Sequence, residues 1–231
     1  MKIDLNPKFI LRALLIVVGI ITIAHIGVNI VRFNYYLDGG AWSNNDYVKV
    51  LIHLFDLDTE NNVPSFYSSL ALLFSSILLY LIALYNKRNR LKYFAWILLS
   101  VVFFYLSLDE ILELHEHLVH LTERMLNLSG YGTAYWVIPY GVLVVILLLS
   151  LFGFLNKLPK STLKLFILSG FIFVSGAVGM EIIGGIQEEL HGKLNVTYVV
   201  LITIEEVLEM LGIVVFIYAL TSYKKFTISI N

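Results

Sequence analysis

The stretch "YFAWILLSVVFFYLSLDEILELHEHLVH", residues 93–120, changes character halfway along its length. Residues 93–108 carry no charged side chain, whereas half of the positions in 107–120 are Asp, Glu or His. An apolar run of this length predicts a helix within a bilayer, whose hydrocarbon core of about 30 Å needs roughly 20 apolar residues. Acidic and imidazole groups at the end of such a helix indicate a functional site, because burying them in a membrane is costly.

The composition of the whole chain supports a membrane protein. Of its 231 residues, 58% are hydrophobic and 14% are charged, and the mean hydropathy is +0.82. We expect an all-α, polytopic fold with six transmembrane helices in a single domain, residues 1–231. The six apolar runs lie near residues 9–33, 64–85, 92–122, 135–155, 162–190 and 194–222.

The basic residues predict the orientation of the chain, because loops that are translocated to the outer side of the membrane are poor in Lys and Arg. With both termini inside, the outer side keeps only Arg32, Lys49, Arg124 and Lys193. The other twelve of the sixteen basic residues fall on the inner side. The chain is therefore expected to be a multipass plasma-membrane protein with its N- and C-termini in the cytoplasm.

The acidic side chains gather in the outer half of three predicted helices. Asp109 and Glu110 follow the third apolar run, and further carboxylates lie in the fifth and sixth runs. At a rise of 1.5 Å per residue, these groups sit at similar depth. On a continuous helix over 92–122, one polar stripe holds the carboxylates and His117, and His115 alone points away from it.

Two octapeptides indicate an internal repeat. "SLDEILEL" at 107–114 and "TIEEVLEM" at 203–210 share one pattern of hydroxyl, aliphatic and acidic residues at an offset of 96. Each half would hold three spans, so the two halves would have opposite orientations, as in the inverted repeats of transporters. We predict a 3+3 inverted repeat with halves of about 8–126 and 135–223.

The fifth run contributes "GMEIIGGIQEELHG" at 179–192. Glu188 and His191 form a Glu-x-x-His pair, the i, i+3 spacing used by carboxylate-bridged metal sites in helical bundles. Glu181 shares a face with Glu188, and the glycines allow close approach of another helix. The same spacing is also typical of a solvated pair at a helix end, so the motif gains weight only beside the other acidic helices.

Buried carboxylates that lie near one another must be protonated, paired with bases or bound to cations. The chain has no cysteine, so a metal would be held by nitrogen and oxygen. A site of carboxylates and imidazoles suits Fe, Mn or Zn better than calcium, and we expect a transition metal without a nucleotide cofactor. Protonated carboxyls and a solvated vestibule are the alternatives. The predicted metal ligands are Asp109, Glu110, Glu113, His117, His120, Glu181, Glu188, His191, Glu205, Glu206 and Glu209.

One residue and one short segment outside the three acidic helices allow both structural and functional interpretations. His25 lies inside the first apolar run near Asn29, where it is interpreted as a hydrogen-bonded structural residue, although it could point at the acidic cluster. The acidic segment 56–60 faintly resembles a calcium loop but lacks the Gly and the closing Glu of that motif. It is therefore interpreted as a solvated loop that ends in a cap for the second helix, with Pro64 in the first turn of that helix.

The stretches "FYLSLDEILELHEHL" at 104–118 and "EEVLEMLG" at 205–212 resemble the signatures of a group of uncharacterised bacterial multipass membrane proteins with a Leu-Ser-Leu-Asp-Glu…His-Glu motif. The resemblance covers most of the chain and implies a six-helix fold in the bacterial inner membrane. It gives weight to Asp109, Glu110, His115 and Glu116, and it implies no reaction.

Three classes of function are compatible with an acidic, outward-facing site. The first is a metal-binding membrane protein, or a metal-dependent enzyme that acts on a lipid or another hydrophobic substrate. The second is a proton- or cation-coupled transporter, and the third is an accessory subunit of a membrane complex. The expected partners are membrane lipids and other membrane subunits. Nucleic acid is not expected, because the basic residues follow the membrane orientation and do not form a patch.

Overall fold

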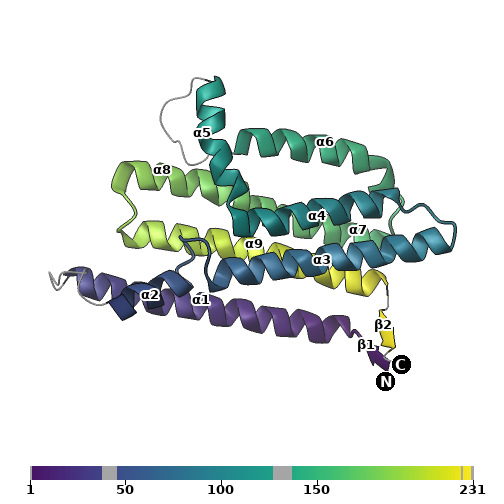
Figure 1. Ribbon diagram of the computed structural model, residues 1–231, viewed down its shortest axis with the longest axis horizontal. Coiled ribbons are helices and arrows are strands. Elements are labelled where there is room, and N and C mark those ends of the chain that lie inside the picture. The colour runs from purple at the N-terminus through teal and green to yellow at the C-terminus, as the bar shows by residue number, and fades with distance from the viewer. Residues whose placement is uncertain (1, 38–45, 127–136, 225, 230–231) are drawn as a thin grey trace.

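The computed structural model describes residues 2–37, 46–126, 137–224 and 226–229, and helices make up nearly all of this part of the chain. The long helices run alongside one another as a bundle (Figure 1). The elements in chain order are β1 (Lys2–Asp4), α1 (Pro7–Leu37), α2 (Asp46–Phe55), α3 (Val63–Arg88), α4 (Phe94–Leu112), α5 (Leu114–Leu126), α6 (Val137–Leu155), α7 (Lys160–Val174), a π-helical segment η3 (Ser175–Met180), α8 (Glu181–His191), α9 (Val196–Tyr223) and β2 (Thr227–Ser229).

Five helical segments are long and apolar enough to cross a membrane. They are residues 7–34 of α1, then α3, α4 and α6, and the continuous stretch 160–191 formed by α7, η3 and α8. The predicted sixth apolar run is present as α9, but α9 is not among these five. The helical membrane fold expected from the sequence is therefore confirmed at the level of five candidate spans.

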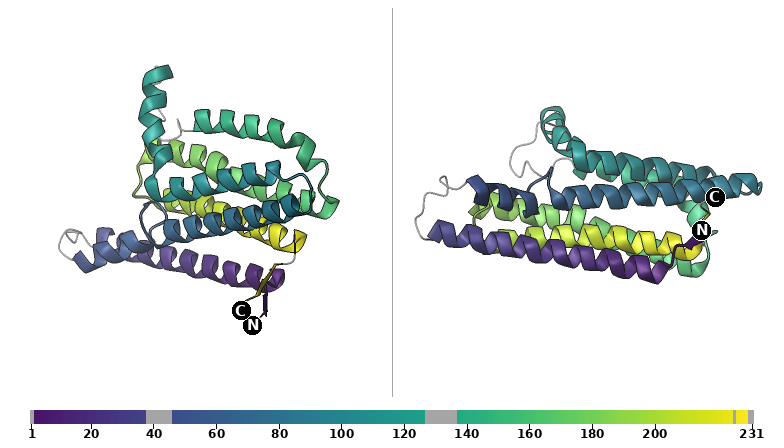
Figure 2. Two further views of the ribbon diagram at one scale, coloured as in Figure 1. Left: turned by 45° about the vertical axis from the view of Figure 1, so that its right-hand side comes forward. Right: turned by 60° about the horizontal axis from the view of Figure 1, so that its bottom comes forward.

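Helix α9 lies at the centre of the bundle. It packs against α1, α3, α7, η3 and α8, and Figure 2 shows it between these helices in two further views. Met210, Val214, Ile217 and Leu220 of α9 are completely covered by their neighbours. The carboxylates of α9 are thus carried by the most enclosed helix of the bundle.

Serine pairs hold α3 and α4 together. The Ser76 hydroxyl donates to the Ser100 carbonyl oxygen at 2.8 Å, and the Ser100 hydroxyl donates to the Ser76 carbonyl oxygen at 2.9 Å. Ser69 and Ser107 make the same reciprocal pair nearer the acidic end of α4. Small residues allow such close helix approach inside a membrane, where helix packing depends on van der Waals contact and hydrogen bonds.

The predicted continuous helix over 92–122 is wrong. Glu113 adopts a left-handed backbone conformation with φ 52° and ψ 38°, which ends α4 at Leu112. α5 then leaves the bundle at a steep angle to α4 (Figure 1). A polar stripe calculated for one straight helix therefore cannot be extended beyond Glu113.

The ends of the described chain meet at one end of the bundle. β1 pairs with β2 in an antiparallel register that sets Lys2 opposite Ser229. Figure 1 shows both termini at this end, beside the α3–α4 turn. The opposite end of the bundle holds α2, the α8–α9 turn and the acidic ends of α4 and α9.

Candidate functional site

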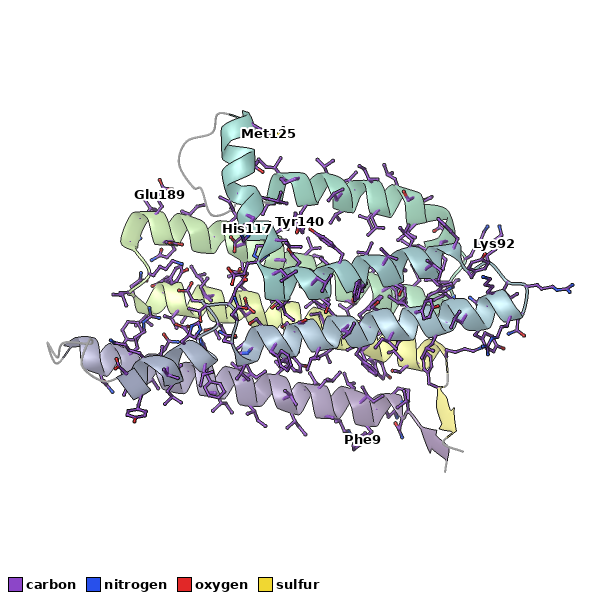
Figure 3. The ribbon with its side chains drawn as sticks, viewed as in Figure 1. Phe9, Lys92, His117, Met125, Tyr140 and Glu189 are labelled. Atoms are coloured by element: carbon purple, nitrogen blue, oxygen red, sulfur yellow. The ribbon has the colours of Figure 1, made fainter. Side chains whose placement is uncertain are left out.

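A cavity of about 600 Å³ opens at the acidic end of the bundle. It lies between the loop before α3, the end of α4, α8 and the first half of α9, and Tyr140 of α6 borders it (Figure 3). Among the described residues, its basic lining side chains are His115 and Lys193. The acidic lining side chains are Asp58, Glu60, Asp109, Glu110, Glu181, Glu188, Glu205, Glu206 and Glu209. The walls are therefore strongly acidic.

The carboxylates from different elements face one another across the cavity. Glu206 of α9 interacts electrostatically with Glu60 in the loop and Glu181 at the start of α8. Glu209 interacts with Glu206, with Glu181 and with Glu110 at the end of α4. Like charges this close repel one another, so the cavity favours either protons or a positively charged ligand.

Glu205 has the least solvent-exposed side chain of the described cavity glutamates. Its residue is 6% exposed, and its Oε2 atom has no hydrogen-bond partner among the described residues. A Cβ at Gly184 would lie 3.6 Å from this oxygen, which places Oε2 against the α8 wall of the cavity. A buried carboxylate oxygen without a donor is costly, so a ligand that supplies a donor or a positive charge would stabilise it.

His115 links the end of α4 to the loop before α3. Its Nδ1 lies 3.3 Å from Asp109 Oδ2, and its Nε2 lies 3.3 Å from Glu60 Oε1. The other oxygen of Asp109 accepts the backbone N–H of His115 at 2.9 Å and the Tyr140 hydroxyl at 3.0 Å. With a carboxylate at each ring nitrogen, His115 is held as an imidazolium.

The stability of the protein is expected to depend on pH through His115, which lies beyond the span formed by α4. Burial lowers the pKa of His115, but the hydrogen bonds and charges of Asp109 and Glu60 outweigh burial and raise this pKa to about 11. Because the pKa is higher in the folded state than its ordinary value of about 6.5, the stabilisation is complete below pH ~6.5 and is lost as the pH rises toward 11. Unfolding followed from pH 6 to 9.5 should show a steady fall in stability for the wild type.

The variant His115→Gln is expected to be nearly independent of pH over the same window, because a glutamine has no proton to lose. His53→Gln is the matched control, since His53 is exposed on α2. A wild type and a His115→Gln variant with the same pH profile would show that the imidazolium does not stabilise the fold.

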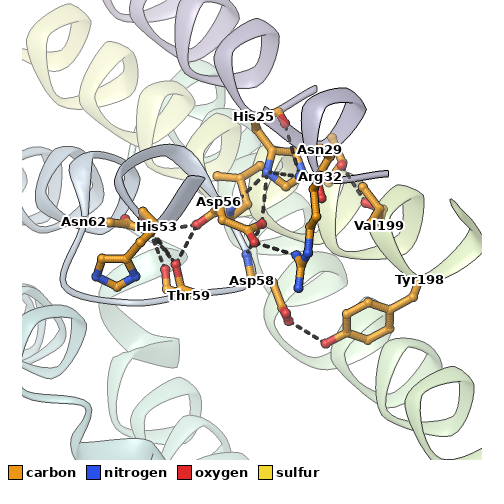
Figure 4. Close-up of polar contacts among 12 residues, drawn as sticks. His25, Asn29, Arg32, His53, Asp56, Asp58, Thr59, Asn62, Tyr198 and Val199 are labelled. Carbon is orange, nitrogen blue, oxygen red and sulfur yellow. Dashed lines mark hydrogen bonds and ion pairs between the residues drawn. The ribbon is translucent and has the colours of Figure 1, made fainter. Parts of the chain in front are cut away.

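The loop before α3 is fixed by contacts to two helices (Figure 4). Asp56 is buried, and its Oδ2 accepts a hydrogen bond from Arg32 Nη1 of α1 at 2.8 Å. The next backbone N–H, that of Leu57, donates to His25 Nδ1 at 2.9 Å, so this nitrogen of His25 is an acceptor. Asp58 Oδ1 accepts the Tyr198 hydroxyl of α9 at 2.5 Å. These contacts hold Asp58 and Glu60 over the cavity.

Asn62 ends this loop and begins α3. Its side-chain oxygen accepts the Ser65 N–H, and the Ser65 hydroxyl accepts the Asn62 N–H, which forms a capping box. Pro64 stands in the first turn, where a missing N–H is tolerated. The prediction of a capped helix start is confirmed, and His25 has the structural role that was expected of it. The prediction of a solvated loop is wrong, because Asp56 and Asn62 are buried against the neighbouring helices.

The π-helical segment η3 brings the α7–α8 wall unusually close to α9. A Cβ on Gly176 would lie 2.7 Å from the Glu205 carbonyl oxygen and 2.9 Å from Glu209 Cγ. π-helical turns inside longer helices often occur at functional sites. We expect this turn to set the spacing between the α8 carboxylates and the α9 carboxylates.

Comparison with known proteins gives a family for this chain. A family model described as "Domain of unknown function (DUF8692)" matches residues 13–223, which is most of the sequence. The chain belongs to the DUF8692 family. No curated protein and no solved structure matches it. The expectation of an uncharacterised family is thus confirmed, whereas the match says nothing about the Leu-Ser-Leu-Asp-Glu…His-Glu motif.

In this DUF8692 protein, seven of the eleven predicted metal ligands line the cavity: Asp109, Glu110, Glu181, Glu188, Glu205, Glu206 and Glu209. Three others lie outside its lining. The Glu113 side chain accepts a hydrogen bond from Asn61, and Nδ1 of His117 lies within hydrogen-bonding distance of the Glu113 carbonyl oxygen. His191 is exposed at the end of α8. The side chain of His120 lies outside the described residues.

The break at Glu113 explains the difference between His115 and His117. The sequence interpretation turned His115 away from the carboxylates, but the left-handed turn points it into the cavity and leaves His117 exposed. Sequence reasoning also missed Asp58, Glu60 and Tyr198 as parts of the site. The alternation of acids in "DLDTE" at 56–60, directly before a capped helix, was the available signal.

No group of three or more His, Asp or Glu side chains is arranged to hold a metal ion within the described residues. The carboxylates are instead spread around a cavity much larger than one ion. The prediction of Fe, Mn or Zn at this site therefore stays a prediction.

Proposed function

We propose that this protein binds a positively charged ligand in the acidic cavity. The observation that carries the proposal is Glu205, whose buried Oε2 has no hydrogen-bond partner among the described residues and lies in a cavity with eight further acidic side chains. An ammonium group or a metal ion would neutralise part of this negative charge and thereby stabilise the enclosed carboxylates. Metal-dependent chemistry on a hydrophobic substrate would use the same site.

Glu205→Gln is expected to weaken cation binding by about tenfold, because it removes one enclosed negative charge and keeps the size of the side chain. Spermidine and Mn²⁺ are suitable probes, and isothermal titration of the purified protein in a nonionic detergent measures their affinities. Elemental analysis of the same sample tests for co-purified Fe, Mn or Zn.

Glu189→Gln is the matched control for this experiment. Glu189 is on the same face of the membrane but is exposed on α8 and points away from the cavity (Figure 3). Equal affinities for the wild type and Glu205→Gln, or no binding of either probe, would contradict the proposed function.

Proton- or cation-coupled transport is the second candidate. It is favoured by the carboxyl groups of Glu181 and Glu205, which lie within hydrogen-bonding reach of each other and could share a proton. A proton-held cluster would tolerate Glu209→Gln without loss of stability, because glutamine keeps the hydrogen-bonding capacity of a neutral acid.

We also propose six crossings with both termini in the cytoplasm of a bacterial cell. Pairing of β1 with β2 supports this, because an even number of crossings returns the two ends of the chain to the same side. The inverted repeat draws support from Glu110 and Glu206, which occupy equivalent positions in the two octapeptides and interact in the cavity. Glu113 and Glu209, the next equivalent pair, do not share the cavity.

Cysteine labelling tests this orientation, since the chain has no cysteine of its own. Cysteines at Asn89 and Asn156 should be shielded from an impermeant reagent in intact cells, whereas cysteines at Asp46 and Glu189 should react. Labelling of the first pair and protection of the second would reverse the orientation and direct the cavity to the cytoplasm.

A further inference from the structure

A second, smaller pocket adjoins the acidic cavity. It has a volume of about 80 Å³ and shares Leu72, Leu106 and Phe173 with the lining of the larger cavity. The shared residues come from three different helices, α3, α4 and α7. The two spaces therefore meet along an apolar edge, with the acidic groups on one side of it.

The rest of the small pocket is apolar apart from Ser169 and lies deeper along the helices. Phe103 of α4 and Phe216 of α9 form part of its wall, and their rings stack with centroids 4.4 Å apart. Gly212 packs so closely on α7 that a Cβ there would lie 2.8 Å from the Phe173 nitrogen. Gly212 falls in the middle of α9, and Phe173 falls near the middle of the continuous helical stretch 160–191, so both lie at the level expected for the hydrocarbon.

The pocket reaches the lipid-facing surface of α7 at Gly170. This glycine lines the pocket and is exposed, and a Cβ there would meet nothing within 4 Å. Its neighbours on α7, Ile167 and Phe171, are exposed large hydrophobic side chains, as expected for a surface in contact with lipid. An apolar chain in the bilayer could thus enter beside Gly170.

The geometry points to a cationic amphiphile, an ammonium head group on a single alkyl chain, as the ligand of this composite site. The inference rests on the proposed function, because it needs the acidic cavity to bind a cation. The ammonium group would lie among the carboxylates near Glu205, and the alkyl chain would leave past Leu106 and Phe173 between α4 and α7.

Charge and shape both favour this ligand over a bare metal ion. An ammonium group has three N–H donors, and the cavity offers carboxylate oxygens on every side, including the Glu205 oxygen that has no partner among the described residues. A combined space of this size is in the range of small-molecule sites, and such sites are largely apolar with a few placed polar groups. The polar end and the apolar end are here separated along the membrane normal.

The test measures binding to purified wild-type protein in a nonionic detergent by native mass spectrometry. The probes are propylamine, octylamine and dodecylamine, with dodecanol as the uncharged probe of equal tail length. Affinity should rise at least tenfold from propylamine to dodecylamine, and dodecanol should bind at least tenfold more weakly than dodecylamine. This chain-length series needs no variant, so it holds even where a substitution disturbs folding.

Two variants test the binding of the ammonium head group and the binding of the alkyl chain independently. Gly170→Leu should weaken dodecylamine by about tenfold and leave spermidine unchanged, because the larger side chain stands at the lipid-side opening of the small pocket and outside the acidic cavity. Gly153→Leu is the matched control, since a Cβ at Gly153 of α6 also meets nothing within 4 Å and Gly153 lines neither space. Glu205→Gln should weaken dodecylamine and spermidine alike.

The outcomes distinguish this inference from the proposed function. If affinity does not rise with tail length, or if Gly170→Leu behaves as Gly153→Leu does, the inference of a cationic amphiphile is wrong. Binding of spermidine or Mn²⁺ that depends on Glu205 would in that case still support the proposed cation binding. If dodecanol binds as tightly as dodecylamine, the site is an ordinary lipid contact. If no cationic probe binds, both proposals fall.

Discussion

Replacing Asp56 by alanine is expected to lower the free energy of unfolding by about 3 to 5 kcal/mol, the range found when one member of a buried ion pair is removed. Asp56 is 3% exposed, and its Oδ2 lies 2.8 Å from Arg32 Nη1. Its other oxygen accepts the Asp58 N–H and lies 3.4 Å from His25 Nδ1. Without this carboxylate, the guanidinium of Arg32 would keep its charge in a partly enclosed place with less compensation. Denaturant unfolding in detergent measures the change.

Asp46→Ala is the matched control for Asp56→Ala. Asp46 also carries an ion pair, with Lys49 at 3.5 Å, but its side chain is 93% exposed. Pairs of this kind contribute little to stability, so no measurable change is expected. Asp56→Asn should fall between the two, because the amide oxygen still accepts a hydrogen bond. Equal stabilities of Asp56→Ala and Asp46→Ala would show that the α1 contacts do not fix the loop.

Loss of Asp56 should also affect the site, because the same loop carries Asp58 and Glu60 into the cavity. The Asn62 side-chain amide would still donate to the backbone carbonyl oxygens of residue 56 and Thr59, so the loop would loosen at the α1 side first. We therefore expect weaker cation binding in this variant together with its lower stability.

The sequence predicted the long helices well because one physical requirement fixes them. Backbone groups in hydrocarbon must be paired within the segment, so an apolar run of sufficient length becomes a helix whatever its exact residues. The runs near 9–33, 64–85 and 194–222 correspond to α1, α3 and α9. The start of α3 was also predictable, since the Asn62 cap and Pro64 act through local contacts.

The break after α4 could not be predicted from local signals. A left-handed residue at a helix end is usually glycine or asparagine, and Glu113 is neither. The turn is stabilised by contacts that reach beyond the local sequence, since Asp109 binds the backbone of His115 and the hydroxyl of Tyr140 on α6. One such residue reverses which histidine faces the cavity, and a calculation of helix faces has no means to detect it.

The sequence predicted which helices carry the acidic residues of the site, but it did not predict the shape of the cavity. Seven carboxylates were placed by depth and helix, because charged groups in a membrane avoid lipid and gather. The loop acids Asp58 and Glu60 are held at the cavity by Tyr198 and His115, which are far from them in sequence. Arg32 and His25 fix the preceding part of the same loop. The distances that decide between a metal and a larger ligand arise from this tertiary packing.

Gly176→Ala is expected to destabilise the protein by about 2 kcal/mol, as other substitutions that overpack a close contact do. The added methyl group would lie 2.7 Å from the Glu205 carbonyl oxygen, 2.9 Å from Glu209 Cγ and 3.1 Å from Leu208 Cβ. One of these atoms is backbone, so a side-chain rotation alone cannot relieve the contact. α9 would have to move away from η3, and cation binding should fall with stability because Glu205 and Glu209 would move with it.

Gly179→Ala isolates the cause of that effect. Gly179 belongs to the same π-helical segment, but a Cβ there would meet nothing within 4 Å. Both substitutions gain the same intrinsic preference of alanine over glycine in a helix, up to about 1 kcal/mol. The difference between the two variants therefore measures the contact with α9 alone. If Gly176→Ala unfolds at the same denaturant concentration as Gly179→Ala and binds spermidine as the wild type does, the close approach of η3 to α9 does not set the spacing of the cavity carboxylates.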